Sequence, residues 1–307
     1  MDHMKKLLIT LLLFLTLPDV SYCQQDGYIR EEAGVIHYKK YGAGIPVLII
    51  NGGPGLDCEG FTSFAELLSD QYMTILYDQR GTGQSILKVS DTSTVTMELM
   101  AKDIEKIRTA LKIDQWIVAG HSFGGWLAEY YATKYPASIK AMILSSSAGI
   151  DMELLKYFDA NMQMGLSKTE RDSLAYWNQK INSGDTSYFA RYQKGKYMAP
   201  AYLFKKEFVP QLAKRLAKGG APEITRLVYK DLFKIRLNFQ ESLRSFSKPV
   251  LIIQGRQDIV GAGAAFRAHA VLKNSQLVFI NECNHYGWLE QKDQFKAAIE
   301  NFIASCK

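Results

Sequence analysis

The feature that most constrains the fold is a serine between glycines, Gly120-His-Ser-Phe-Gly124, placed between a predicted strand and a predicted helix. The apolar run Trp116–Ala119 precedes it, and a helical pattern runs from Ser122 to about Tyr135, where Pro136 ends it. A serine at such a junction sits on a sharp turn that exposes its hydroxyl above the end of a sheet. Backbone N–H groups at the helix N-terminus also favour negative charge there. The pattern therefore predicts a nucleophilic serine at the edge of a sheet.

Apolar runs alternate with helical patterns on both sides of this turn. Continuous aliphatic runs bounded by Gly or Pro suit strands that are buried on both faces. The predicted strands are Pro46–Ile50, Met73–Tyr77, Trp116–Ala119, Ala141–Leu144, Pro249–Ile253 and Leu277–Ile280, after β-like stretches at Tyr28–Arg30 and Val35–Lys39. The predicted helices cover about 61–69, 96–111, 122–135, 264–271 and 294–304. This alternation predicts a mostly parallel, doubly wound sheet with right-handed crossovers.

Residues 150–245 interrupt the alternation. They contain 14 aromatic residues and few β runs, which favours a helical cap inserted into a core domain of residues 24–149 and 246–307. An insert placed where strands end would roof the crevice in which open α/β sheets bind ligands. Residues 151–245 carry 17 Lys and Arg against 10 Asp and Glu. Solvated helix faces explain this excess most simply, and attraction of anionic ligands or surfaces is the alternative.

A serine hydroxyl is a weak nucleophile and needs a base. Of the five histidines, His285 follows the last predicted strand, at the sheet edge where catalytic residues collect. The others lie in the N-terminal segment, a β-like stretch, the serine turn and a helix, and we expect the side chain of His121 to point away from the nucleophile. Asp258 follows the strand at 249–253, where a carboxylate could orient the histidine. We therefore predict a triad of Ser122, His285 and Asp258.

An acyl transfer site also needs two N–H donors for the oxyanion. One should be the amide of Phe123, the residue after the nucleophile. The other should come from Gly52-Gly-Pro-Gly55, because glycine lets the backbone turn an N–H toward the substrate. We predict Gly53 as that donor.

Three motifs together resemble the proline iminopeptidase family of α/β-hydrolases. They are Asn51-Gly-Gly-Pro-Gly55, Asp78-Gln-Arg-Gly-Thr-Gly-Gln-Ser85 and Gly120-His-Ser-Phe-Gly-Gly125. The resemblance covers about 28–149 and 246–305, and the family usually has His where this chain has Asn51. It implies an α/β-hydrolase fold with a helical cap, no cofactor, the same triad and the same two oxyanion donors. It also implies removal of N-terminal residues, often proline, from peptides.

We therefore expect a serine hydrolase that forms an acyl-enzyme on small peptides or aminoacyl amides. A carboxylesterase with the same machinery and a different cap pocket is the first alternative, and a non-catalytic ligand-binding protein on this fold is the second. Epoxide hydrolases and haloalkane dehalogenases are disfavoured because they place Asp at the position of Ser122. An aminopeptidase also needs an anionic group for the substrate ammonium. In the family, cap glutamates supply it, and the sequence singles out none of those in the insert.

A basic and then apolar segment opens the chain. Two lysines precede the apolar run Leu7–Leu17, which is shorter than the roughly 20 residues of a membrane span. Together with the small-residue exit, this pattern indicates a secretory signal over residues 1–23 and export to the periplasm or the medium. Lipid attachment at Cys23 is disfavoured because Tyr22 is bulky.

Other classes of function lack support in the sequence. No pair of cysteines has metal-ligand spacing, and no nucleic-acid motif is present. A small molecule or a short peptide is the expected partner, and the sequence assigns no oligomeric state. After export, Cys58, Cys283 and Cys306 would remain, of which at least one must be unpaired.

Overall fold

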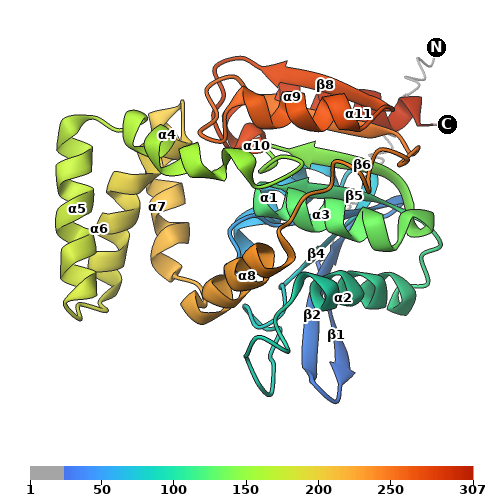
Figure 1. Cartoon of the computed structure of the whole chain (residues 1–307), viewed down its shortest axis with the longest axis horizontal. Helices are drawn as coiled ribbons and strands as arrows, with labels where there is room; N and C mark the ends of the chain where they lie inside the picture. The colour runs from blue at the N-terminus through green and yellow to red at the C-terminus, as the bar shows by residue number, and fades with distance from the viewer. Residues whose placement is uncertain (1–23, 307) are drawn as a thin grey trace, which may run out of the picture.

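A computed structural model describes residues 24–306 of the chain (Figure 1). The predicted secretory signal over residues 1–23 lies outside the described residues, so export stays a prediction. Within residues 24–306, no helix combines the length and the hydropathy that a membrane span requires.

Eight strands form one sheet in the order β1-β2-β4-β3-β5-β6-β7-β8. Strands β1, β2 and β4 pair antiparallel, and all pairs from β4 to β8 are parallel. The strands are β1 (Gln25–Glu31), β2 (Gly34–Tyr41), β3 (Ile45–Ile50), β4 (Tyr72–Tyr77), β5 (Trp116–His121), β6 (Ile139–Ser145), β7 (Val250–Gly255) and β8 (Ser275–Ile280). The prediction of a mostly parallel, doubly wound sheet is confirmed.

Helices cover both faces of the sheet and bury its central strands. Along β3, Leu48 and Ile50 join one apolar cluster and Val47 and Ile49 join the other, as the two-residue period of a strand requires. One face packs against α2 (Met97–Ala110), α3 (Phe123–Lys134) and α9 (Ala262–Val271). The other packs against α1 (Thr62–Leu68), α10 (Gly287–Glu290) and α11 (Lys292–Ser305). Burial on both faces explains why these strands read as continuous apolar runs.

The start of α2 shows how local sequence fixes an element. Thr96 adopts an extended conformation, and its hydroxyl accepts the N–H of Leu99 at 3.2 Å. This is a helix N-cap, and Glu98 in the first turn complements the helix dipole. The apolar positions Met97, Met100, Ile104 and Ile107 are all buried, as their helical spacing predicts.

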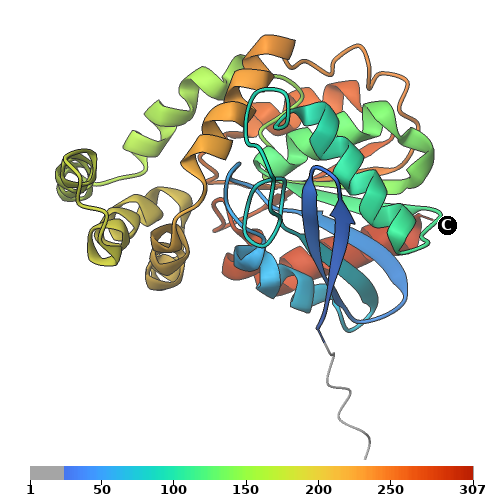
Figure 2. The same cartoon turned by 90° about the horizontal axis from the view of Figure 1, so that it is seen from below.

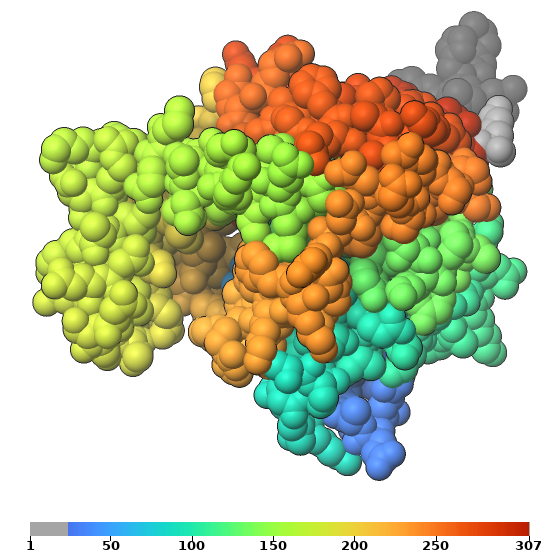
Figure 3. Space-filling model, in the orientation of Figure 1, coloured from blue at the N-terminus to red at the C-terminus, as the bar shows by residue number. Residues whose placement is uncertain are grey.

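The cap lies between β6 and β7 and consists of helices. They are α4 (Phe158–Met164), α5 (Lys168–Asn182), α6 (Tyr188–Met198), α7 (Val209–Lys218) and α8 (Pro222–Ile235), with short 3-10 turns between them. Helix α6 packs against both α5 and α7, and this group projects to one side of the sheet domain (Figures 1 and 2). Helix α8 returns to the core beside α2. Figure 3 shows a hollow between these cap helices and the core.

The three cysteines of the described region, Cys58, Cys283 and Cys306, are all buried and unpaired. Burial raises the pKa of each thiol above its usual range. Thiols in this state are poor nucleophiles at neutral pH, so these residues serve the apolar core.

Candidate active site

The serine turn joins β5 to α3 in a conformation that few side chains adopt. Ser122 has φ 54° and ψ −121°, in a region where non-glycine residues are strained. The flanking glycines allow the required approach. A methyl group on Gly124 would lie 2.2 Å from the carbonyl oxygen of Ile50, and one on Gly120 would lie 2.3 Å from that of Gly124. The tight contact between helix and strands therefore holds Ser122 at the sheet edge.

His285 and Asp258 form a buried pair behind this serine. The Nδ1 atom of His285 lies 2.9 Å from Oδ1 of Asp258, and both side chains are almost fully buried. Because a carboxylate only accepts hydrogen bonds, the proton lies on Nδ1 and the Nε2 atom is left as the acceptor. Asp258 follows β7 and His285 follows β8, so neighbouring parallel strands deliver both residues to one edge. The structure thus places Ser122 and His285 at the same pocket, with Asp258 hydrogen-bonded to His285.

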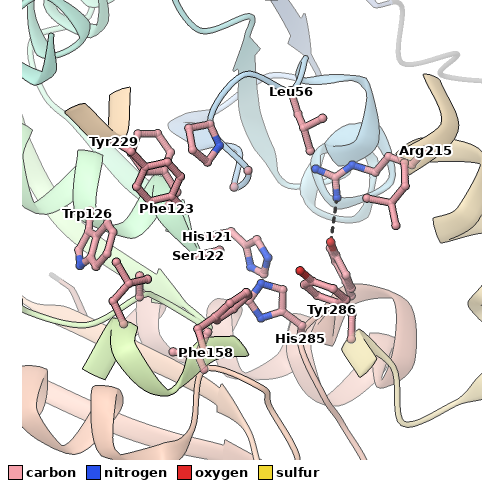
Figure 4. Close-up of a pocket in the computed structure, with 18 of the residues that line it drawn as sticks. Leu56, His121, Ser122, Phe123, Trp126, Phe158, Arg215, Tyr229, His285 and Tyr286 are labelled. Carbon is pink, nitrogen blue, oxygen red and sulfur yellow. Dashed lines mark hydrogen bonds between the residues drawn. The ribbon is translucent and has the colours of Figure 1, made fainter. Parts of the chain in front are cut away.

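A pocket of about 190 Å³ opens beside Ser122 and His285 (Figure 4). Its floor comes from the core and its roof from the cap. The core supplies Trp126, Val260 and the predicted oxyanion residues Gly53 and Phe123, and the cap supplies Leu154, Leu155, Phe158, Tyr202, Arg215, Leu216 and Tyr229. Among the described residues, no Asp or Glu lines this pocket. Asp258 lies behind the imidazole of His285 and does not line the pocket.

The glycine-rich loop after β3 runs directly beside the nucleophile. A methyl group on Gly52 would lie 2.7 Å from Cβ of Ser122, and Gly53 has φ 76°, which favours glycine. Within residues 24–306, the amides of Gly53 and Phe123 have no hydrogen-bond acceptor. Both residues line the pocket, so these two N–H groups are available to an oxyanion.

The Asp78-Gln-Arg-Gly motif holds the glycine-rich loop after β3 in place through hydrogen bonds. The Nε2 atom of Gln79 donates to the carbonyl oxygen of Asn51 at 2.8 Å. The side-chain Nδ2 atom of Asn51 in turn donates to the carbonyl oxygen of Leu56 at 3.1 Å, which closes the loop. Arg80 forms a two-point pair with Asp103 of α2 at 2.8 and 2.5 Å. The motif therefore positions the loop, and it does not line the pocket itself.

Asp78 is the anchor of this support. It accepts the amides of Cys58 and Gln84, each at 2.9 Å, and Nδ1 of His37 at 2.8 Å. Burial lowers the pKa of His37, but hydrogen bonds and charge interactions with Asp78 and Asp26 outweigh burial and raise it above 6.5. Burial raises the pKa of Asp78, but its hydrogen bonds outweigh burial and lower it below 3.8. Both shifts favour a charged pair at mildly acidic pH.

This pair predicts a pH-dependent stability. The contribution of His37 is complete below its unfolded pKa of 6.5 and is lost as pH rises through its raised folded pKa. The contribution of Asp78 is present above 3.8 and is lost as pH falls through its lowered folded pKa. We expect the melting temperature to fall by a few degrees as pH rises from about 6 to 8. This slope should be weaker in His37→Gln and unchanged in His269→Gln, a change at an exposed histidine. Equal slopes in all three proteins would contradict the assignment.

The loop that carries His285 is tied to the Asp258 loop and to the cap. The His285 amide donates to the carbonyl oxygen of Tyr202 at 3.1 Å. The side chain of Asn284 accepts the Ile259 amide at 3.1 Å and donates to the carbonyl oxygen of Ala201 at 2.9 Å. These bonds hold the imidazole between a core loop and a cap segment.

Glu290 reinforces the same junction. One oxygen of its buried carboxylate accepts the amides of Phe204 and Lys205 at 2.5 and 2.9 Å, and the other accepts the amide of Asn284 at 2.7 Å. Amide hydrogen bonds to a buried carboxylate are strong. Sequence reasoning missed this role, because a glutamate at the end of a short helix carries no signal of it.

His121 differs from its prediction. Its ring lines the pocket, with its centroid 4.5 Å from the ring of His285 and 5.5 Å from that of Tyr286 (Figure 4). The side chain follows the face of β5 that packs against Phe61 and Trp288, and this brings it toward the site. Burial, and then charge interactions with His285 and Arg215, hold the pKa of His121 well below 6.5. His121 is therefore neutral at physiological pH.

Comparisons with known proteins agree with this geometry. Residues 45–291 match the profile of a family described as alpha/beta hydrolase fold. A proline iminopeptidase of Saccharolobus solfataricus is 26% identical over 306 residues, which cover 94% of this chain and 96% of that protein. The resemblance to proline iminopeptidases is thereby confirmed.

Solved structures show the same fold. An alpha/beta fold family hydrolase from Bacillus anthracis superposes with a TM-score of 0.75 at 21% identity, over 91% of this chain and 99% of that one. A thermophilic esterase from Thermogutta terrifontis superposes with a TM-score of 0.69 at 22% identity, over 92% of this chain and 99% of that one.

Among residues 24–306, no cluster of His, Cys, Asp or Glu could hold a metal ion.

Proposed function

Because the chain belongs to the α/β-hydrolase fold family, we propose that it is a serine hydrolase that cleaves small esters or amides through an acyl-enzyme on Ser122. One observation carries the proposal. Ser122, on its strained turn, and His285, paired with Asp258 at 2.9 Å, line the same pocket. A nucleophile, a base and a group that orients the base are the components that acyl transfer needs.

The proposed reaction follows from these positions. The Ser122 oxygen attacks the carbonyl carbon while Nε2 of His285 takes its proton, and the amides of Gly53 and Phe123 hold the oxyanion. The tetrahedral intermediate then collapses, and the leaving alcohol or amine departs with the proton from His285. Water attacks the acyl-enzyme by the same path in reverse and releases the carboxylic acid. Asp258 keeps the imidazole in the required tautomer and stabilises the imidazolium.

The pocket favours a small, largely apolar substrate. Leu154, Leu155, Phe158 and Trp126 offer aliphatic and aromatic surface, and a volume of about 190 Å³ admits only a short group beside the serine. The absence of Asp and Glu from the lining of the described pocket disfavours a free ammonium in the substrate, because a buried cation needs an anionic partner. We therefore favour carboxylic esters and amides without a free α-amine.

An iminopeptidase-like aminopeptidase is the second candidate. It is supported by the similarity to a proline iminopeptidase over 94% of this chain. Acidic residues do line a neighbouring cavity, beyond Arg215 and Tyr286, and these are Asp57, Glu59, Glu66 and Glu207. An aminoacyl substrate would have to place its ammonium there.

A substrate panel tests both candidates. The wild-type chain is incubated with para-nitrophenyl butyrate and with fluorogenic amides of proline and alanine, and separately with a fluorophosphonate probe. We expect ester hydrolysis to exceed amide hydrolysis, and the probe to label Ser122, identified by peptide mass. Faster release from the prolyl amide would favour the aminopeptidase. Absence of a Ser122 adduct would support a ligand-binding protein on this fold and contradict the proposal.

A further inference from the structure

One wall of the pocket carries a positive charge. Arg215 projects from α7, and its guanidinium lies over the ring of Phe61 at 4.8 Å and near that of Tyr286 at 5.7 Å. Its Nη1 atom donates to the hydroxyl of Tyr286 at 3.3 Å. Figure 4 shows this pair on the opposite side of the pocket from Trp126, with His121 and His285 between them. These contacts hold the guanidinium in the pocket that Ser122 also lines.

Arg215 has no acidic partner in the described part of the chain. The phenol of Tyr286 is its one side-chain acceptor there, and its buried Nε atom has none. The buried Arg80, by contrast, makes two hydrogen bonds to Asp103. A guanidinium has five N–H donors, and leaving them unpaired away from water is unfavourable. Arg215 therefore has several donors free for a ligand.

The core leaves space for this side chain. A methyl group on Gly60 would lie 2.1 Å from Nε and 2.7 Å from Cζ of Arg215. The absence of a side chain at residue 60 thus provides the slot in which the guanidinium stacks on Phe61. The guanidinium of Arg215, from the cap, therefore packs directly against Gly60 and Phe61 of the core.

We propose that Arg215 binds a carboxylate of the substrate, so that the enzyme prefers esters or amides bearing a carboxylate near the scissile bond. The inference rests on the proposed function and specifies its substrate class. The planar fork of a guanidinium matches the two oxygens of a carboxylate. The net positive charge of the cap would attract such substrates over a longer range.

The carboxylate could belong to the acyl group or to the leaving group, and two matched substrate pairs separate these cases. Mono-para-nitrophenyl adipate is compared with para-nitrophenyl hexanoate for the acyl side. For the leaving side, para-butyryloxybenzoic acid, which carries the carboxylate, is compared with its methyl ester, methyl para-butyryloxybenzoate, which does not. For each pair, the measured quantity is the ratio of kcat/KM between the charged and the neutral member.

Variants assign any preference to Arg215. In Arg215→Met, we expect kcat/KM for the charged member of one pair to fall about 100-fold, and that for its neutral partner to change less than about threefold. Gly60→Ala should lower the same ratio by displacing the guanidinium. Arg226→Met removes an equal charge from an exposed site on α8 and should leave the ratio unchanged. Equal losses on charged and neutral members in Arg215→Met, or no preference in the wild type for either pair, would overturn the inference while leaving the proposed hydrolase intact.

A binding experiment makes the inference independent of turnover. Calorimetry with mono-para-nitrophenyl adipate and with para-butyryloxybenzoic acid compares Ser122→Ala with Ser122→Ala/Arg215→Met. We expect Kd to rise at least about tenfold for one of them when Arg215 is removed. Equal affinity of both proteins for each ligand would reject the carboxylate site even if no substrate is turned over.

Discussion

Replacement of Ser122 by alanine is expected to lower kcat for ester hydrolysis by about 10⁵- to 10⁶-fold, as removal of a triad nucleophile does elsewhere. The reason is that no other hydroxyl lies on the serine turn between the free amides of Gly53 and Phe123. The fold should persist. In the described structure the Ser122 hydroxyl makes no hydrogen bond that alanine would lose, and alanine meets the same backbone strain.

Initial rates with para-nitrophenyl butyrate and melting temperatures of both proteins provide the measurement. Ser183→Ala, which makes the same change at an exposed position after α5, is the control and should match the wild type. If Ser122→Ala retains more than about a hundredth of the wild-type rate at an unchanged melting temperature, Ser122 is not the nucleophile.

Replacement of Asp258 by asparagine should have the second-largest effect, a fall in kcat of about 10⁴-fold. The shape of the side chain is kept, but one oxygen, Oδ1, accepts both Nδ1 of His285 and the Val260 amide, each at 2.9 Å. A carboxamide that turns its NH2 group toward Nδ1 of His285 gives up the Val260 bond and moves the imidazole proton to Nε2. The histidine then has no lone pair facing Ser122 and cannot take its proton.

The pH profile of kcat distinguishes this cause from misfolding. Part of the Asp258→Asn activity should return at high pH, where hydroxide removes the need for a general base. Asp172→Asn changes an exposed carboxylate on α5 and serves as the control. Activity of Asp258→Asn close to that of the wild type at neutral pH would show that another group orients His285.

Much of this architecture could be predicted from the sequence because it depends on short-range patterns. Strands buried on both faces are continuous apolar runs, and Pro46–Ile50 and Trp116–Ala119 lie within β3 and β5. Parallel strands point their carboxyl ends to one edge, so residues that directly follow strands meet in space. That topology explains why Asp258 and His285, 27 residues apart, form a hydrogen bond.

The substrate side of the pocket could not be predicted, because it depends on how separate cap segments meet the core. Leu154, Arg215 and Tyr229 lie on different cap segments, and their periodicity shows which faces are buried but not against what. Arg215 is one of the 17 basic residues of the insert, and only its contacts with Phe61 and Tyr286 distinguish it. The long-range support that Gln79 gives to Asn51 likewise has no signature in spacing alone.

The position of Glu290 has a consequence for the evolution and engineering of this enzyme. Its carboxylate receives main-chain donors from Phe204 and Lys205 on one side and from Asn284 on the other. Because those donors are backbone groups, the side chains of residues 204 and 205 can be replaced without loss of these hydrogen bonds. Side chains of the cap can therefore be replaced, and the substrate preference altered, while His285 keeps its position. A chimera that combines this core with a foreign cap must preserve the backbone path at 204–205 rather than any particular residue there.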